Sequence, residues 1–217
     1  MREHKNISIA DQIFEQLERE ILSGKYPRST VLSELGLSKE LGVSRTPVRE
    51  AIRRLEQEDI LEECGKGMVV VGITPEDMKD MFEIRLAVEG EAARRAAQLI
   101  TDDRLHALRE ILDLQRFYSE KGGENSSDQI KNMDSQFHEI VYSACGSRPY
   151  IRTLLPLHKR MMKLRKASVS KHSRAMQSLE EHEAIYEALR KHDPDAAEEA
   201  VLTHTRNARE RMTNLGT

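Results

Sequence analysis

The stretch 42–61, GVSRTPVREAIRRLEQEDIL, constrains the fold most, because it joins a helix start to an apolar stripe and a basic face. Ser44 and Thr46 are good N-cap residues, and Pro47 suits a first turn, where a missing backbone N–H costs nothing. Apolar residues at three- and four-residue spacing form the stripe: Val48, Ala51, Ile52 and Leu55. Off that stripe lie four arginines: Arg45, Arg49, Arg53 and Arg54. Such a helix can enter the major groove of DNA, whereas the alternative is a solvated helix face.

The flanking segments favour the DNA-binding interpretation. Residues 31–41 (VLSELGLSKEL) carry a short helical pattern, and Gly42 marks a tight turn into the next helix, as in a helix-turn-helix. Residues 60–63 and 68–73 are short β-prone runs joined by a glycine-containing turn, which predicts a β-hairpin, the wing of a winged helix. Residues 7–22 carry apolar residues at helical spacing and are expected to form the first helix.

The rest of the chain has helical periodicity. Six segments show apolar spacing near 3.6: 76–100, 102–120, 127–144, 148–170, 173–192 and 195–214. Pro156 falls inside the fourth segment and predicts a kink or a split there. We therefore expect a mainly α protein, with a winged helix-turn-helix at 1–73 and an antiparallel bundle of six or seven helices at 75–217.

Charge and composition restrict where nucleic acid can bind. The formal net charge of the 217 residues is −3, so a DNA contact has to come from the local basic stretch rather than from bulk attraction. Cys64 and Cys145 lack metal or redox spacing and suggest a reducing cytoplasm. No apolar run approaches the ~18 residues of a membrane span, and the charged amino terminus does not resemble a signal peptide. We expect a cytoplasmic protein without a membrane partner.

Polar side chains interrupt the apolar stripes of the second half at four positions. Asp134 and His138 are four residues apart and project from one face of a helix. His182 and His204 interrupt two further stripes and lie about equally far from the turn between their helices, so an antiparallel hairpin puts them at similar height. Three imidazoles and one carboxylate predict one divalent transition-metal ion per chain, Zn²⁺ or Ni²⁺. The alternative is a hydrogen-bonded core network.

The remaining histidines are expected at the surface: His4, His106, His158, His172 and His192. Arg85 is different, because it lies on the otherwise apolar stripe of the segment 76–100, where a guanidinium should have a buried anionic partner. We expect this partner to be a small organic acid that also completes the shell of the metal. An ion pair with Glu89, four residues on, is the alternative.

The sequence also resembles a known family. The run LGVSRTPVREAIRRLEQEDIL and its Gly-Lys-Gly wing resemble the DNA-binding domain of GntR-family bacterial transcription regulators. One departure is Leu35, which stands where the family pattern LSERELA has an arginine, so a DNA contact made there by relatives should be missing. Four later stretches resemble the FCD-type ligand-binding domain of the FadR subfamily: FEIRLAVEGEAARRAA, MDSQFHEIVYSACG, EEHEAIYEALRKHD and DAAEEAVLTHT. Six helices would resemble the shorter, VanR-like branch of that subfamily.

This resemblance implies site residues in both domains. In metal-containing members, an Asp-x-x-x-His helix and two later histidines hold the ion, and these positions match Asp134, His138, His182 and His204. The arginine of the IRLAVE segment, here Arg85, faces the effector in that family.

We therefore expect a ligand-responsive transcription regulator and not an enzyme. It would be a repressor released by a small carboxylate bound at a metal-containing pocket, and the alternative is a regulator in which the ion itself is the signal. Arg45 and Arg49 are expected to reach base edges, and the Lys66–Gly67 wing tip a phosphate or the minor groove. Three further residues are expected at phosphates or flanking bases: Ser44, Thr46 and Arg53. A homodimer would read a palindromic operator.

Overall fold

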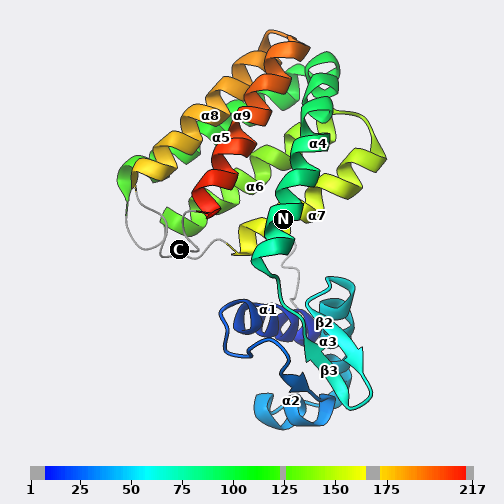
Figure 1. Cartoon of the computed structure of the whole chain (residues 1–217). Coiled ribbons are helices and arrows are strands. Elements are labelled where there is room, and N and C mark those ends of the chain that lie inside the picture. Colours follow the sequence, from blue (N-terminus) through cyan, green and yellow to red (C-terminus); the bar gives the residue numbers. More distant parts are fainter. Residues whose placement is uncertain (1–7, 123–125, 165–171, 214–217) are drawn as a thin grey trace. The chain divides into compact units, whose positions relative to one another are not determined.

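The structure is a computed structural model that describes residues 8–122, 126–164 and 172–213. The chain divides between Thr74 and Pro75 into two compact units, each with its own hydrophobic core (Figure 1). Helices dominate both units, and a small sheet completes the first. The prediction of a mainly α protein with a winged helix-turn-helix followed by a helical bundle is confirmed.

The first unit, as far as it is described, holds three helices and a three-stranded sheet. Its elements are α1 (Ile9–Leu22), β1 (Val31–Leu32), α2 (Glu34–Leu41), α3 (Arg45–Gln57), β2 (Leu61–Cys64) and β3 (Gly67–Val70). The sheet order is β1-β3-β2, and both pairings are antiparallel. The predicted wing is the hairpin of β2 and β3, in which Leu61 lies opposite Val70 and Cys64 opposite Gly67.

The apolar stripe of α3 supplies much of the core of this unit. Val48, Ala51 and Leu55 are each 0% exposed, and they pack with buried apolar residues of α1 and of the sheet. Each fully buried aliphatic side chain of this size contributes roughly 1.5–3 kcal/mol relative to an exposed one. Arg54 adds a polar link, because its Nη1 donates to Asp11 Oδ1 at 2.6 Å and its guanidinium lies over the Phe14 ring.

The segment 31–41 is not a single helix as predicted. Val31 and Leu32 form β1, which pairs with β3, and α2 begins only at Glu34. Ser33 separates the two elements, because its hydroxyl accepts a hydrogen bond from the Gly36 amide at 3.0 Å and so caps α2. Gly42 ends α2 with a left-handed conformation at φ 67°, which glycine adopts without steric cost.

The second unit, within its described residues, is a bundle of six helices. They are α4 (Pro75–Leu99), α5 (Asp102–Lys121), α6 (Ser126–Ala144), α7 (Arg148–Leu164), α8 (His172–Arg190) and α9 (Pro194–Thr213). The last helix, α9, lies along the first, α4, while α5 lies against α6 and α8 (Figure 1). The helices α4 and α9 pack closely at Gly90, where a Cβ atom would lie 3.1 Å from Glu198 Cγ and 3.3 Å from Leu202 Cδ1.

Pro156 does not split α7, which continues through it from Arg148 to Leu164. The helix loses one backbone hydrogen bond there because proline has no N–H. Leu154 and Met161, on either side of the proline, are both buried, so core packing holds the two halves in one helix.

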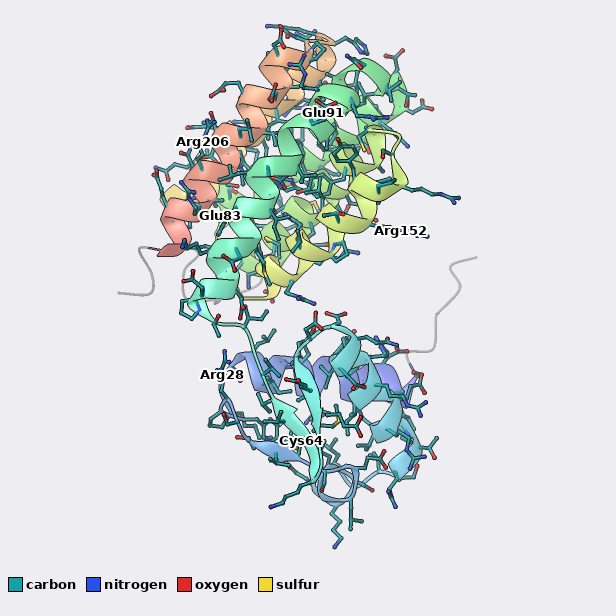
Figure 2. All side chains as sticks on the ribbon, turned by 45° about the vertical axis from the view of Figure 1, so that its right-hand side comes forward. Arg28, Cys64, Glu83, Glu91, Arg152 and Arg206 are labelled. Carbon is teal, nitrogen blue, oxygen red and sulfur yellow. The ribbon has the colours of Figure 1, made fainter. Side chains whose placement is uncertain are left out.

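Charged side chains cover the outer faces of the helices. Glu83, Arg152 and Arg206 are exposed and point away from the bundle (Figure 2). Within the described ranges, none of the helices has an apolar stretch long enough to cross a membrane.

Candidate functional site

The exposed face of α3 carries the residues predicted to contact DNA. Because the apolar stripe of α3 is buried, the side chains at the other angles face solvent. Arg45, Thr46, Arg49 and Arg53 are among them, and the N-cap residue Ser44 is exposed as well. Ser44 is the N-cap residue of α3, yet its side chain makes no capping hydrogen bond within the described structure. A hydroxyl and the first amide groups of a helix can both donate to a phosphate.

Glu34 joins the two arginines that were predicted to reach bases. The Nε of Arg49 donates to Glu34 Oε1 at 2.8 Å, and its Nη2 donates to Oε2 at 2.9 Å. The Nη2 of Arg45 donates to the same Oε2 at 2.9 Å. The hydrogen bonds from Arg49, which have the larger effect, and from Arg45 lower the pKa of Glu34 to about 2. The carboxylate is therefore charged at neutral pH. The sequence pattern did not single out Glu34, because the contact depends on how α2 packs against α3.

The wing tip is placed as predicted at the turn between β2 and β3. Lys66 is exposed there and carries a positive charge. Gly67 has a structural role as well, because its φ is 144° and a Cβ atom would lie 2.5 Å from the Leu32 carbonyl oxygen. The departure at Leu35 is also visible, since this leucine is 53% exposed at the start of α2.

Five polar side chains meet inside the second unit. The four predicted residues, Asp134 and His138 of α6, His182 of α8 and His204 of α9, are all at most 3% exposed. A fifth, His158 of α7, is 2% exposed. In the Asp134–His138–His158 group, and in the group of His138, His182 and His204, the nitrogen and oxygen atoms all lie within 4.8 Å of one another.

The prediction that His158 lies at the surface is wrong. His158 lies four residues after Leu154 and three before Met161, which are both buried, so the helical spacing puts it on the inward face of α7. Its Nε2 lies 3.3 Å from Asp134 Oδ2. The spacing was visible in the sequence, but the expected break at Pro156 hid it. His106 and His192 are exposed as predicted, and His4 and the side chain of His172 lie outside the described part.

Two outer partners orient the imidazoles of this cluster. Nδ1 of His204 lies 2.8 Å from Glu181 Oε2, and Nδ1 of His182 lies 3.0 Å from Gln115 Oε1. A carboxylate oxygen only accepts, so the His204 proton belongs on Nδ1 and its Nε2 lone pair faces the cluster. Sequence analysis did not find Glu181 or Gln115.

The cluster fits a first-row divalent metal ion. Nε2 of His138 lies 3.2 Å from Nε2 of His204. Two imidazole nitrogens bound to one tetrahedral zinc at ~2.0–2.1 Å would be about 3.3 Å apart. Burial lowers the pKa of His138 well below its usual value, and the neighbouring His158 lowers it further. The neutral imidazole, the form that binds metals, is therefore favoured.

Arg85 forms the ion pair that was the alternative to an effector contact. Its Nε donates to Glu89 Oε1 at 2.8 Å, and both side chains are buried. Glu89 also accepts hydrogen bonds from the hydroxyls of Tyr142 and Thr205, the latter at 2.5 Å. Burial raises the pKa of Glu89, but the charge of Arg85 outweighs this and lowers it.

One nitrogen of Arg85 is left for a further contact. Nη2 is buried and has no hydrogen-bond partner among the described residues. A cavity of about 20 Å³ adjoins Arg85, Asp134, His158 and His204. This is room for one water molecule, so an organic acid requires the cavity to widen. Three methionines line it: Met161, Met162 and Met212. Methionine side chains repack readily.

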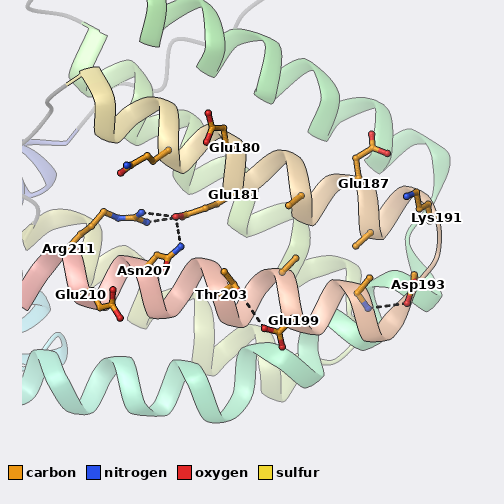
Figure 3. Close-up of a pocket in the computed structure, with 15 residues that line it drawn as sticks. Glu180, Glu181, Glu187, Lys191, Asp193, Glu199, Thr203, Asn207, Glu210 and Arg211 are labelled. Atoms are coloured by element: carbon orange, nitrogen blue, oxygen red, sulfur yellow. Dashed lines mark hydrogen bonds and ion pairs between the residues drawn. The ribbon is translucent and has the colours of Figure 1, made fainter.

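A larger groove of about 990 Å³ lies on the outer face between α8 and α9 (Figure 3). Acidic side chains surround it, and Glu181 connects it to the interior cluster through His204. Glu181 is held in place by Arg211, whose Nη1 lies 2.7 Å from Oε1, and by Asn207 (Figure 3). Burial raises the pKa of Glu181, but the hydrogen bonds from Arg211 and His204 lower it to about 2.

A winged helix with an arginine-rich third helix, joined to a helical unit with a polar interior, has the architecture of a two-domain transcription regulator. Comparison with known proteins agrees. The model of bacterial regulatory proteins of the gntR family matches residues 9–70, and the FCD domain matches residues 80–207. The chain therefore belongs to the gntR family and carries an FCD domain, and members of this family are transcription regulators rather than enzymes.

Relatives match over most of the chain. The HTH-type transcriptional repressor RspR of Escherichia coli is 29% identical over 208 residues, which cover 95% of this chain and 90% of that protein. The gluconate operon transcriptional repressor of Bacillus licheniformis is 27% identical over 186 residues, which cover 83% and 75%. The structure of E. coli McbR/YncC is similar to this one with a TM-score of 0.75 and 20% sequence identity. The match covers 97% of this chain and 100% of that chain, and shows that the two proteins share a fold.

Proposed function

We propose that this protein is a ligand-responsive repressor that binds an operator through α3 and leaves it when a small organic acid binds in the second unit. The observation that carries the proposal is the buried cluster of Asp134 and histidines beside Arg85, in a chain whose first unit exposes an arginine-rich helix. Asp134, Arg85 and four histidines are buried together, and desolvating so many polar groups is costly in a bundle that is purely structural.

At the operator, Arg45 and Arg49 contact base edges, with guanine favoured because its N7 and O6 accept from one guanidinium. Ser44, Thr46 and Arg53 contact phosphates or flanking bases. The exposed Lys66 and the adjacent Gly67 bring the wing to a phosphate or to the minor groove. A cytoplasmic homodimer reads a palindromic site, because two copies related by a two-fold axis present two recognition helices. Exposed apolar side chains on α4 and α5, such as Ile84 and Phe117, offer surface for that pairing.

In the second unit, Asp134, His138, His182 and His204 hold one divalent ion, zinc or nickel. When bound there, such an ion would supply Lewis-acid chemistry that suits a carboxylate effector. The free Nη2 of Arg85 donates to a carboxylate oxygen of the effector, and the Glu89 pair keeps the guanidinium in place. We assign the chain to the FadR subfamily because of its FCD domain, and to the shorter, VanR-like branch because the described part of the second unit has six helices.

A second candidate is a metal-sensing regulator, in which the ion is the signal. The size of the interior cavity, about 20 Å³, favours it, because this space admits a water molecule but not an organic acid. The two candidates differ in what changes operator binding.

The test is elemental analysis of the purified protein, followed by thermal unfolding against a panel of small carboxylates with and without chelator. A bound divalent ion and a chelator-sensitive stabilisation by one acid support the first candidate. Operator affinity that follows added metal, with no effect of any acid, supports the second. Absence of bound metal after reconstitution with zinc and with nickel contradicts both.

A further inference from the structure

The carboxylate of Glu34 is less exposed than the side chains of Arg45 and Arg49, the two arginines expected to contact bases. The Glu34 side chain is 27% exposed, whereas those of Arg45 and Arg49 are 57% and 48% exposed. Both arginines donate an N–H from Nη2 to the same oxygen, Oε2 of Glu34. Two positively charged guanidinium groups that donate to one oxygen atom are close enough to repel each other. The negative charge of the shared carboxylate offsets this repulsion and allows them to lie side by side.

The geometry leaves the far end of the Arg49 guanidinium for another acceptor. Glu34 takes the Nε–H and one N–H of Nη2, which are two of the five N–H donors of an arginine. The N–H groups of Nη1 and the second N–H of Nη2 form the opposite edge. That edge has the fork shape that matches O6 and N7 of guanine.

The charge of Glu34 also affects binding to DNA that lacks the right bases. Arg45 and Arg49 together carry two positive charges, and Glu34 cancels one of them locally. Binding to phosphates without base contacts is electrostatic, so a carboxylate at the surface weakens it. In the correct operator, base contacts offset this weaker attraction to phosphates, since Glu34 already holds the free edge of the Arg49 guanidinium in the orientation that a guanine requires.

We propose that Glu34 is a positioning residue that sets sequence specificity: it directs the free edge of Arg49 toward a guanine and discourages binding to DNA that offers only phosphates. This inference rests on the proposed function, because it assumes that Arg45 and Arg49 face the bases.

The test compares full-length variants on two DNA duplexes. The first duplex is selected from a randomised library by the wild-type protein, and the second is a shuffled duplex of the same composition. The variants are Glu34→Gln, which keeps the shape but removes the charge, and Glu34→Ala. The matched control is Glu40→Gln, since Glu40 also lies on α2 but pairs with Lys25 and Tyr26 instead of α3.

We expect Glu34→Gln to bind the shuffled duplex more tightly and the selected duplex less tightly, so that the affinity ratio falls about tenfold or more. Glu40→Gln changes both affinities in the same direction and keeps the ratio. If the ratio for Glu34→Gln matches that of Glu40→Gln, the proposal is wrong. If Glu34→Ala is unfolded by circular dichroism, the result with Glu34→Gln decides.

A second readout separates positioning from a structural role. Each guanine of the selected duplex is replaced in turn by 7-deazaguanine, which lacks the N7 acceptor. The wild type loses affinity at one guanine, and Glu34→Gln loses much less at the same position. Equal losses in both proteins contradict the proposal. Arg49→Ala tests the underlying assignment, because specific binding that survives this substitution refutes the reading role of α3 whatever Glu34 does.

Discussion

Nε2 of His138 lies 3.2 Å from Nε2 of His204, and each ring belongs to a different helix of the second unit. Since Glu181 accepts from Nδ1 of His204, the two inward nitrogens can share one proton or bind one ion. The spacing suits two ligands of the same metal, and burial lowers the pKa of His138, which favours the neutral ring that a ligand requires.

We predict that His138→Ala and His182→Ala lower both the metal content and the midpoint of thermal unfolding. A ligand present at a hundred times its dissociation constant stabilises a protein by about 2.7 kcal/mol, and this stabilisation is lost with the ion. Elemental analysis and a thermal melt with and without chelator measure it. His106→Ala is the control, because His106 is an exposed histidine of α5. Stoichiometric metal in both variants would show that the cluster is not the site.

Arg49→Ala should abolish specific operator binding and leave the helical content unchanged, because the side chain is exposed and contributes nothing to the core. Loss of one base-contacting arginine costs about 1–3 kcal/mol of discrimination. Gel-shift titration on selected and shuffled duplexes gives the ratio. Arg206→Ala, at an exposed arginine of α9, should have no effect on that ratio.

Glu89→Ala should destabilise the second unit by about 3–5 kcal/mol, because it leaves the buried guanidinium of Arg85 without its counter-ion. The double substitution Arg85→Met/Glu89→Ala should cost less than the single one, since no buried charge remains. Urea unfolding of the three proteins measures the difference. If the double variant is the less stable, the ion pair is not the reason for the loss.

Gly67→Ala should distort the wing. The glycine has φ 144°, and a Cβ atom would lie 2.5 Å from the Leu32 carbonyl oxygen, so either β1 moves or the backbone of β3 changes. Strain of this kind costs on the order of 1–3 kcal/mol. The control is Gly65→Ala in the same turn, where a Cβ atom meets nothing within 4 Å. Thermal unfolding and DNA binding of the two variants should differ clearly, and equal effects would exclude the close contact as the cause.

The link between α2 and α3 should weaken in acid. Hydrogen bonds from Arg49 and Arg45 lower the pKa of Glu34 from 4.5 to about 2 in the folded protein. The stabilisation is therefore complete above the unfolded pKa and is lost as the pH falls through 4.5 toward 2. Amide hydrogen exchange in α2 and α3, compared between wild type and Glu34→Gln, measures it. The two proteins should differ near neutral pH and converge in acid; a constant difference would exclude Glu34 as its source.

Periodicity alone predicted most of the fold. The buried residues of α3, and the helices of the second unit, follow from apolar spacing because each has a clear inward stripe. It failed at β1, because Val31 and Leu32 are too few residues to show a period, and the sheet partner that holds them is far away in sequence. The possible split of α7 at Pro156 was also wrong, because buried residues on both sides of the proline keep the helix continuous.

Some residues of the candidate sites could likewise be predicted from local sequence patterns, and others could not. Asp134, His138, His182 and His204 each interrupt an apolar stripe, so their inward direction is local information and the structure brings them together. His158 has the same signal, but it lies close to the proline. Glu34 and Glu181 carry no such signal, because what they do depends on which helix packs against theirs.

The absence of a side chain at Gly90 lets α4 and α9 pack closely. A Cβ atom at this position would lie 3.1 Å from Glu198 Cγ, so any larger residue would push the two helices apart or displace the Glu198 side chain. His204 is carried by α9, and Pro75, the first residue of α4, follows the wing strand in the chain after a short connection. A displacement of α9 that accompanies a change around His204 would therefore reach α4 through this contact, within the second unit.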